Sequence, residues 1–368
     1  MLIEFCYPTI RRKEMDAVLT VMVDEKIGPG EQAERLIQTA KERLGFEYCI
    51  ALRSPAMALF FALKLLDLPP RSGVVISSLS PAYYIRVLED AGLTAVFCDV
   101  GAASPCPDAA TISAALSTAT GTAALDTKGD PAPDNDTEAA GGSKITVRAV
   151  VLHHNLGFMP DMEGIAALGI PFIEDCSAAY MSGFGEKKAG TYGVFTILGL
   201  EERDMLTSGG GALLYASDRR NAAVLRNAAE LPPEYGLPDV NAAMALTQFK
   251  ETEKNLQKRG KIAELYTQSA LRQGRHKMFV CPDMFEYNNY AFPLILETGM
   301  KEVAAYAKRK EIAIENAFSK TPAGMGLVKQ ENCPTACSLS LRAALFPIYP
   351  RLGDAAAMRV AKLIQTLP

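Results

Sequence analysis

Apolar residues recur at helical spacing in four stretches of the first hundred residues, which are 9–24, 31–44, 54–66 and 83–91. This spacing predicts four helices. Short apolar runs at 74–77 and 94–99 flank the last of these helices and predict strands. A strand, a helix and a strand in succession are typical of a parallel sheet. The first part of the chain therefore predicts an α/β fold.

The alternation of strands and helices continues in the middle of the chain. Strand-like sequence at 147–152 and 171–174 encloses a helical stretch at 161–168, and a further strand is predicted at 211–215. Residues 118–144 break the pattern, because Ala, Thr, Gly, Asp and Pro dominate there and leave little to bury. Strand-like sequence resumes directly afterwards. We therefore predict that 118–144 is a mobile surface insertion and not a linker between domains.

The pattern changes after a charged helix that is predicted at 250–271. The elements predicted beyond it are a strand at 291–296 and helices at 300–310 and 354–367. This mixture is typical of a smaller α+β unit. The length of 368 residues also suits a large domain with a smaller one attached. We predict a large domain at 1–255 and a small C-terminal domain at 256–368.

Charge, apolar runs and cysteine spacing exclude several classes of partner and site. The formal net charge of -4 gives no basic surface, which argues against nucleic acid as a partner. No run approaches the roughly 18 apolar residues of a membrane-spanning helix, and no apolar run at the N-terminus predicts a signal peptide. The eight cysteines are scattered, and Cys333 and Cys337 have no histidine nearby, so no metal site is predicted. We expect reduced thiols in a cytoplasmic protein.

A series of short motifs runs nearly from end to end of the chain. These motifs are Tyr7-Pro8, Gly28-Pro29-Gly30, His154-Asn155-Leu156-Gly157, Pro160-Asp161-Met162, Ile173-Glu174-Asp175, Gly190-Thr191-Tyr192-Gly193, Gly209-Gly210-Gly211-Ala212, Cys333-Pro334-Thr335-Ala336, Leu345-Phe346-Pro347-Ile348-Tyr349-Pro350 and Leu352-Gly353-Asp354. In their order and spacing they resemble the DegT-type nucleotide-sugar aminotransferases, which are fold-type I enzymes of pyridoxal phosphate (PLP). The resemblance implies a PLP-transferase-like large domain with a mixed, mostly parallel seven-stranded sheet, a small C-terminal α+β domain and a homodimer.

The resemblance also locates the cofactor's catalytic partners, and one of them is changed. In the family, an aspartate at the position of Asp175 pairs with the pyridine nitrogen, and a lysine 28 residues further on forms an imine with PLP. That position is Arg203, and no lysine occurs from 189 to 249. A guanidinium stays protonated and forms no imine, so no catalytic residue is assigned here. Arg203 is either a surface arginine paired with a neighbouring acid (Glu201, Glu202 or Asp204) or an anion-binding group in the pocket.

Other cofactor contacts that the resemblance implies are also altered. The phosphate-binding turn of the family aligns with Ser54-Pro55-Ala56, where proline removes an amide donor and alanine removes a hydroxyl. Ser54 is equally suited to cap a helix. By alignment, Pro81 stands in place of the aromatic residue that stacks on the pyridine ring, with Tyr83 or Tyr84 as substitutes. Ala178 replaces a Gln or His that touches the ring hydroxyl, and Leu198 replaces a Ser that touches the phosphate. Glu234 lies near the position of an Asn that the neighbouring subunit supplies in the family. What is left is a vestigial cofactor pocket at Asp175, Ser54, Ala56, Ser80 and Ala178.

Two histidines, His153 and His154, end a predicted strand. A histidine there is able to act as an acid or a base, or simply to pack near the edge of the sheet. No thiol, serine or carboxylate stands at a recognisable spacing from either of them. The sequence therefore predicts no replacement active site.

The function that follows is a homologue of the PLP-dependent sugar aminotransferases without transaminase activity. We expect a non-catalytic role, as a binder of a nucleotide-sugar ligand or as a partner of an active paralogue, linked to nucleotide-sugar or polysaccharide metabolism. No cofactor is expected, and any PLP is expected to bind non-covalently. The alternative is an active PLP-dependent sugar-modifying enzyme, either an aminotransferase or a dehydratase-like enzyme (some relatives with histidine at the lysine position are dehydratases), that uses a non-standard base. A pocket for the nucleotide sugar alone is a third possibility.

Overall fold

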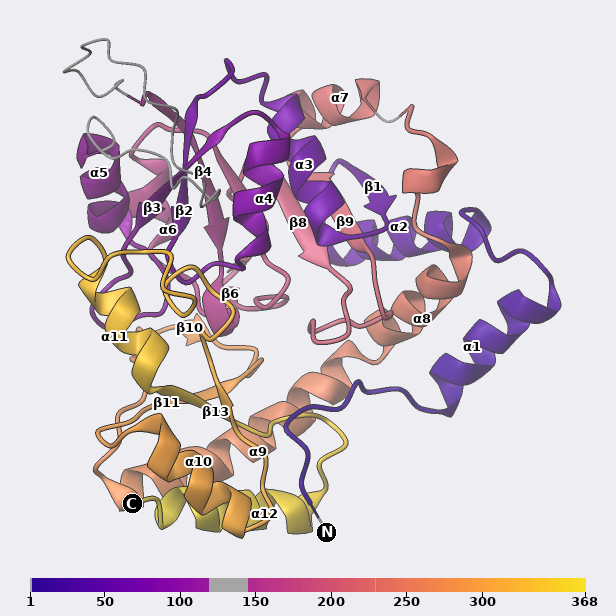
Figure 1. Cartoon of the computed structure of the whole chain (residues 1–368). Helices are drawn as coiled ribbons and strands as arrows, with labels where there is room; N and C mark the ends of the chain where they lie inside the picture. Colours follow the sequence, from indigo (N-terminus) through magenta and orange to yellow (C-terminus); the bar gives the residue numbers. More distant parts are fainter. Residues whose placement is uncertain (1, 119–144, 229) are drawn as a thin grey trace, which may run out of the picture.

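The computed structural model describes residues 2–118, 145–228 and 230–368 (Figure 1). Apart from Thr118, the insertion predicted at 118–144 lies outside the described residues. No helix in the described part of the chain is long and apolar enough to cross a membrane.

A mixed seven-stranded sheet forms the centre of the larger part of the molecule, in the order β1-β9-β8-β5-β4-β2-β3. Its strands are β1 (Tyr48–Leu52), β2 (Gly73–Ser77), β3 (Thr94–Cys98), β4 (Val147–His153), β5 (Phe172–Asp175), β8 (Phe195–Gly199) and β9 (Ala212–Ala216). The strands from β3 to β8 run parallel, whereas β9 is antiparallel to both β8 and β1. The predicted fold class, with a mixed and mostly parallel seven-stranded sheet, is confirmed.

Helices cover both faces of this sheet. One face carries α3 (Pro55–Leu65), α4 (Tyr83–Asp90) and α7 (Arg219–Asn227), and the other carries α2 (Glu31–Leu44), α5 (Ala109–Thr118), α6 (Met162–Ala166) and α8 (Asp239–Lys250). Strands such as β2, β8 and β9 are buried along their whole length. The sequence of a strand that is buried on both faces is a nearly continuous apolar run, as expected for a parallel sheet between two helical layers.

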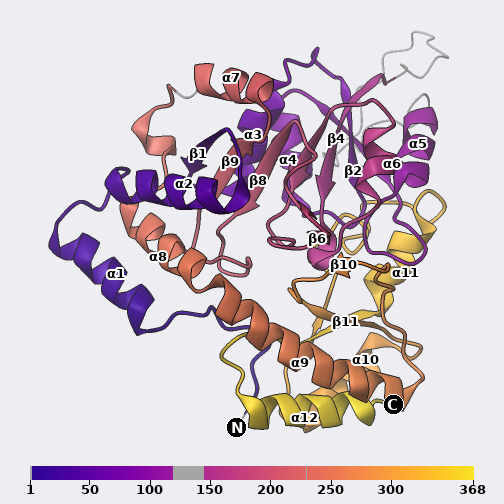
Figure 2. The ribbon, with the colours of Figure 1, turned by 180° about the vertical axis from the view of Figure 1, so that it is seen from behind.

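The C-terminal part has a second sheet of three antiparallel strands, in the order β11-β13-β12. The elements here are α9 (Thr252–Gln273), β11 (Phe292–Ile295), α10 (Met300–Arg309), β12 (Glu315–Asn316), α11 (Pro334–Arg342), β13 (Ala343–Phe346) and α12 (Asp354–Gln365). The helices α9, α10 and α12 pack against this sheet around one apolar cluster, at the end of the molecule where both termini lie (Figure 2). The domain boundary after residue 255 stays a prediction, and it falls in the first turn of α9.

Smaller elements complete the chain. They are α1 (Arg12–Val23), which packs on α8, the short sheet of β6 (Gly183–Phe184), β7 (Lys187–Lys188) and β10 (Phe285–Glu286), and the 3-10 turns Asn155–Gly157 and Pro233–Tyr235. Every helix and strand that the sequence predicted is present, with ends that differ by a few residues. The sequence did not predict β1, β8, β13, α5, α7, α8 or α11, nor the two-residue strands β6, β7, β10 and β12.

One carboxylate connects the two parts of the molecule. Asp99 follows β3 of the large sheet and accepts hydrogen bonds from the backbone N–H groups of Thr335 (3.0 Å) and Ala336 (2.7 Å) in the first turn of α11. These N–H groups have no partner within the helix, and the helix dipole favours a negative charge beside them. Asp99 therefore acts as an N-terminal cap supplied from another layer of the fold.

Replacing Asp99 with Ala is expected to lower the free energy of unfolding by about 1 kcal/mol, since loss of a capping side chain costs about 0.5–2 kcal/mol. Asp99→Asn, which keeps one acceptor oxygen, should lose less. Urea unfolding followed by circular dichroism measures both changes. Equal stability of the Ala variant and the unchanged protein would show that the cap contributes nothing.

Candidate functional site

A cavity of about 750 Å³ lies between the carboxyl ends of the parallel strands and the C-terminal part. We call it the cleft. Its lining comes from the N-terminal segment (Phe5, Cys6), the start of α4 (Pro81, Ala82, Tyr83), the end of β4 (His153, Asn155, Leu156), Ala178, the loop after β8 (Glu201, Glu202, Arg203, Asp204), and the C-terminal part (Arg259, Tyr290 and a segment from Glu315 to Thr321). The edge where parallel strands end is the usual ligand site of such folds.

Arg203 crosses the cleft to the C-terminal part. Its Nη1 and Nη2 atoms donate to the two carboxylate oxygens of Glu315 on β12, at 2.7 and 3.2 Å, and the guanidinium lies 5.8 Å from the ring centre of Phe5. The sequence placed the partner of Arg203 among its neighbours, and this was wrong. The side chains of Arg203 and Glu315 are 52% and 39% exposed, so the ion pair adds at most about 1 kcal/mol. It nevertheless fixes where the arginine lies.

Asp175 ends β5 and is almost fully buried. Its Oδ1 atom accepts hydrogen bonds from the backbone N–H (3.0 Å) and the hydroxyl (2.5 Å) of Ser177, and its Oδ2 atom accepts one from the hydroxyl of Tyr84. His153 on the neighbouring strand β4 places Nδ1 3.5 Å from Oδ2. Burial acts to raise the pKa of Asp175, but His153 and the hydrogen bonds outweigh it and hold the pKa at about 2. The carboxylate is therefore ionised and already satisfied by its own chain.

Tyr84 decides whether this carboxylate is open to a ligand. Its side chain is fully buried, and its hydroxyl occupies one oxygen of Asp175. A pyridine nitrogen cannot reach Asp175 while Tyr84 holds this place. Of the two tyrosines predicted as substitutes for the stacking residue, Tyr83 lines the cleft and Tyr84 does not, and a stacking role for Tyr83 stays a prediction. As they stand, these residues do not fit PLP.

The other predicted pocket residues are dispersed. Ala178 lines the cleft with Arg203, but Ser54, Ala56 and Ser80 do not. The Ser54 hydroxyl caps α3 by accepting from the backbone N–H of Met57 at 3.2 Å, as its capping interpretation predicted. The hydroxyl of Ser80 is buried and donates to the carbonyl of Ser77 at 2.7 Å. The role of these residues toward a cofactor stays a prediction.

The two histidines at the end of β4 have different surroundings. His154 is fully buried, and its Nε2 lies 2.8 Å from Glu174 Oε1. Glu174 also accepts from the backbone N–H groups of Gly190, Tyr192 and Gly193 at 2.7–3.1 Å. Burial acts to raise the pKa of Glu174, but His154 and these amides lower it on balance. His154 is thus a structural residue that secures the loop before β8, whereas His153 lines the cleft.

Sequence reasoning missed the contacts of these histidines with carboxylates. Two successive histidines end β4, and two successive acids, Glu174 and Asp175, end β5 beside it. The parallel register pairs His153 with Asp175. The signal was therefore present in the sequence as two polar pairs at neighbouring strand ends. Their pairing required the order of the strands in the sheet, which local pattern does not supply.

The cleft contains cations as well as acids. Arg259 donates from Nη1 to the backbone carbonyls of Asn289, Tyr290 and Ile348, at 3.3, 2.9 and 2.7 Å. Among the described residues no carboxylate forms an ion pair with Arg259, and burial lowers its pKa from the ordinary value. Lys320 is exposed and is the one lysine among the described lining residues. Arg259 and Lys320 thus give this side of the cleft a positive character.

Asp204 is the second carboxyl group at the floor of the cleft. Its Oδ2 accepts from the backbone N–H of Glu201 at 2.8 Å. Shielding from solvent is the largest cause that raises the pKa of Asp204, and the negative charges of Asp175 and Glu201 raise it further. The hydrogen bond from the Glu201 amide lowers it, and the resulting pKa is about 7. Asp204 therefore changes charge near neutral pH.

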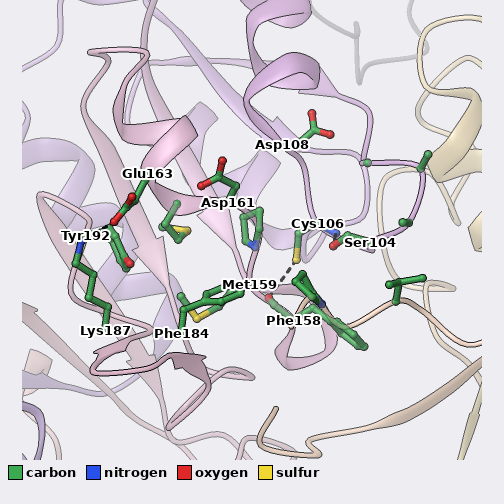
Figure 3. A pocket seen from close by; sticks show the side chains of 17 residues that line it. Ser104, Cys106, Asp108, Phe158, Met159, Asp161, Glu163, Phe184, Lys187 and Tyr192 are labelled. Carbon is green, nitrogen blue, oxygen red and sulfur yellow. Dashed lines mark hydrogen bonds and ion pairs between the residues drawn. The ribbon is translucent and has the colours of Figure 1, made fainter. Parts of the chain in front are cut away.

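A second cavity, of about 710 Å³, lies beside α5 and α6 (Figure 3). Its lining is mostly apolar, with Phe158, Met159 and Phe184 among the labelled side chains. The polar groups at its edge are already engaged, since Glu163 pairs with Lys187 at 2.6 Å and Asp161 caps α6. The cleft, whose lining includes Arg203, Arg259, Lys320 and the titratable Asp204, is therefore the stronger candidate. In the described part of the chain no three His, Cys, Asp or Glu side chains gather around a common metal position.

Comparisons with known proteins agree with the architecture. A sequence model of the DegT/DnrJ/EryC1/StrS aminotransferase family matches residues 8–365. The chain is 23% identical over 392 residues to a dTDP-4-dehydro-2,3,6-trideoxy-D-glucose 4-aminotransferase of Saccharopolyspora spinosa, which covers 97% of this chain and 94% of that protein.

Solved structures show the same fold. An aminotransferase from Streptoalloteichus hindustanus superposes with a TM-score of 0.83 at 20% identity, over 99% of this chain and 98% of the other. DesV of S. venezuelae, in complex with a ketimine intermediate, gives 0.79 at 18% identity, over 96% and 93%. The chain belongs to the DegT/DnrJ/EryC1/StrS aminotransferase family.

Asp204→Asn is expected to stabilise the protein at pH 8 more than at pH 4. The carboxyl group titrates at about 7 in the folded chain against an ordinary 3.8, so its protonated form favours folding, and this contribution is lost as the pH rises from about 4 to about 7. The asparagine stays neutral throughout. Melting temperatures of both proteins at the two pH values measure the difference.

The matched control for this experiment is Glu202→Gln, an exposed acid of the same loop. The gap between this variant and the unchanged protein should not depend on pH. If the Asp204→Asn gap is likewise independent of pH, Asp204 is not a shielded carboxyl group with a raised pKa.

Proposed function

We propose that this member of the DegT/DnrJ/EryC1/StrS family binds a nucleotide-sugar ligand in the cleft and does not catalyse transamination. The observation that carries the proposal is the contact between Tyr84 and Asp175. A buried hydroxyl stands where the ring nitrogen of PLP needs a free carboxylate. The resemblance assigns the imine to the position of Arg203, and that side chain is tied to Glu315. These two contacts support the proposal that the chain does not carry out the family chemistry.

The lining of the cleft supports a sugar nucleotide as the ligand class. Arg259 and Lys320 supply positive charge for a diphosphate, and Arg259 is held in place by backbone carbonyls. Tyr83, Tyr290 and Phe318 supply aromatic surface for a sugar or a base. The S. spinosa relative is named for a dTDP-linked 4-dehydro sugar. We extend that substrate class, and no particular sugar, to this chain.

The second candidate is an active PLP-dependent sugar-modifying enzyme that uses a non-standard base. The observation in its favour is Lys320, whose amine is exposed and whose residue lines the cleft. An amine in this position could form an imine in place of the family lysine. A non-catalytic role beside an active paralogue and a cytoplasmic location remain part of the first proposal.

We also propose that the protein is a homodimer. Four apolar residues recur at helical spacing on the outer face of α1, and each is more than half exposed; they are Met15, Leu19, Met22 and Val23. The opposite face of α1 is already packed on α8. A stripe of this kind on a projecting helix (Figure 1) is a common feature of subunit contacts, and a second copy of the chain supplies the same stripe.

PLP is expected to leave no adduct on the protein after borohydride reduction, whereas a dTDP-linked 4-dehydro sugar is expected to raise the melting temperature. Mass spectrometry of the reduced protein and a thermal-shift titration measure these two results. Lys320→Gln is the control, since Lys320 is the one lysine among the described residues that line the cleft. A reduced PLP adduct that is lost in Lys320→Gln would establish the second candidate. Stabilisation by PLP but by no sugar nucleotide would refute the first.

Leu19→Glu is expected to convert a dimer into a monomer, because a charge in the apolar stripe must be buried when the subunits meet. Light scattering with size-exclusion chromatography measures the mass. Leu271→Glu, which changes an exposed leucine on α9, serves as the matched control and should leave the dimer intact. If the unchanged protein is already a monomer, the stripe on α1 is not a subunit contact.

A further inference from the structure

The proposed function leaves one chemically capable group of the cleft unused, the imidazole of His153. Its side chain is 14% exposed and lines the cleft at the end of β4. The chain contains three histidines, and the other two, His154 and His276, are buried, whereas His153 is partly exposed. Only His153 among them lines the cleft.

The surroundings of His153 fix the position of its ring proton. Nδ1 lies 3.5 Å from Asp175 Oδ2 and 3.4 Å from the hydroxyl oxygen of Tyr84. An ionised carboxylate only accepts, and Tyr84 donates its one proton to that carboxylate. Neither group can therefore donate to Nδ1. In the neutral imidazole Nδ1 carries the proton and Nε2 carries the lone pair.

The lone pair of Nε2 faces accessible space. No hydrogen bond to Nε2 is present within the described residues. Nε2 is also not among the buried side-chain atoms without a partner, which in the described chain belong to Arg43, His154 and His276. Since His153 lines the cleft, this basic nitrogen is available to a bound molecule. The carboxylate of Asp175 thus lies on the Nδ1 side of the imidazole, and the cleft lies on its Nε2 side. This is the arrangement of a general base that a carboxylate orients.

We propose that His153 is a general base that acts on a carbonyl-bearing nucleotide sugar, with Asp175 as its positioning residue. This activity needs no cofactor. It rests on the sugar-binding part of the proposed function, because the sugar must bind in the cleft, and it replaces the non-catalytic role with a catalytic one. Nε2 takes a proton from a carbon next to the carbonyl, the C–H electron pair forms a carbon–carbon double bond, and the carbonyl π pair moves to oxygen. The enolate then regains a proton from the imidazolium, so no oxidant or reductant is consumed.

The charge that develops on the carbonyl oxygen also finds partners in the cleft. Arg203, Arg259 and Lys320 line the same cavity as His153. Backbone carbonyls hold Arg259 in place before any ligand binds, whereas Arg203 is held only by its weak, exposed pair with Glu315. Fixed positive groups stabilise a developing oxyanion without having to reorganise. The cleft thus contains a base and stabilising cations in one cavity.

A purely structural role for His153 makes a different prediction. In that role the imidazole serves only to balance the charge of Asp175 beside Tyr84. Replacing His153 would then change the stability of the protein but not the rate of any chemical step. Hydrogen exchange at a bound sugar distinguishes the two roles.

The test uses the full-length protein and dTDP-4-dehydro-2,3,6-trideoxy-D-glucose in D2O. Proton NMR follows the replacement of hydrogen by deuterium at the carbons that flank the carbonyl, and calorimetry measures binding. The protein is expected to accelerate exchange over the rate in buffer. His153→Gln should lower the accelerated rate by about 100-fold, in the range of a general base, without weakening binding. Asp175→Asn should lower the rate at saturating sugar while the dissociation constant stays unchanged.

His276→Gln is the matched control, because it removes a histidine outside the cleft and should keep full exchange. Circular dichroism and melting temperature establish that each variant is folded; His153→Gln alone decides the outcome if Asp175→Asn does not fold. Binding without accelerated exchange, or equal exchange in His153→Gln, overturns the assignment of a base and leaves the proposed function standing. Failure of the sugar to bind overturns both.

Discussion

The buried carboxylate of Asp175 is the constraint around which the cleft is built. It lies at the end of a central strand with almost no contact with water. An unpaired charge in such a place costs several kcal/mol, so the chain must bring donors to it. They come from α4 through Tyr84, from the following turn through Ser177, and from β4 through His153. The start of α4 and the end of β4 are fixed to one another by this shared partner.

The same carboxylate sets the electrostatics of its neighbours. Because Asp175 stays ionised, a second negative charge close to it is unfavourable, and the pKa of Asp204 rises for this reason in addition to its shielding from solvent. The hydroxyl of Tyr84 is likewise held in its protonated form, since its burial and the adjacent charge raise its pKa. This part of the chain therefore has one fixed negative charge at Asp175, and two groups that line the cavity, the carboxyl group of Asp204, which titrates near neutral pH, and the imidazole of His153.

The opening of the cleft depends on weaker contacts between the two parts of the molecule. Arg203 and Glu315 meet across it while both remain exposed, and such pairs contribute little energy. The Asp99 cap on α11 is more sheltered and contributes more. The cavity of about 750 Å³ is within the usual size range of small-molecule sites. The fold of the aminotransferase family is retained, and function depends on the side chains in the site and not on the fold alone.

The sequence by itself determined the layers of the fold, and it has an arginine, Arg203, where the resemblance to the family implies the imine-forming lysine. Hydrophobic periodicity located α2, α4 and the strands from β2 to β5, and the series of motifs implied the seven-stranded sheet. Arginine at position 203 excludes an imine there by its own chemistry, whatever the fold. Tertiary structure alone decided the partners. Arg203 binds Glu315, 112 residues away, and Tyr84 binds Asp175, 91 residues away. Local pattern reports which face of an element is buried, whereas these contacts depend on strand order, helix placement and side-chain direction, which exist only once the chain is packed.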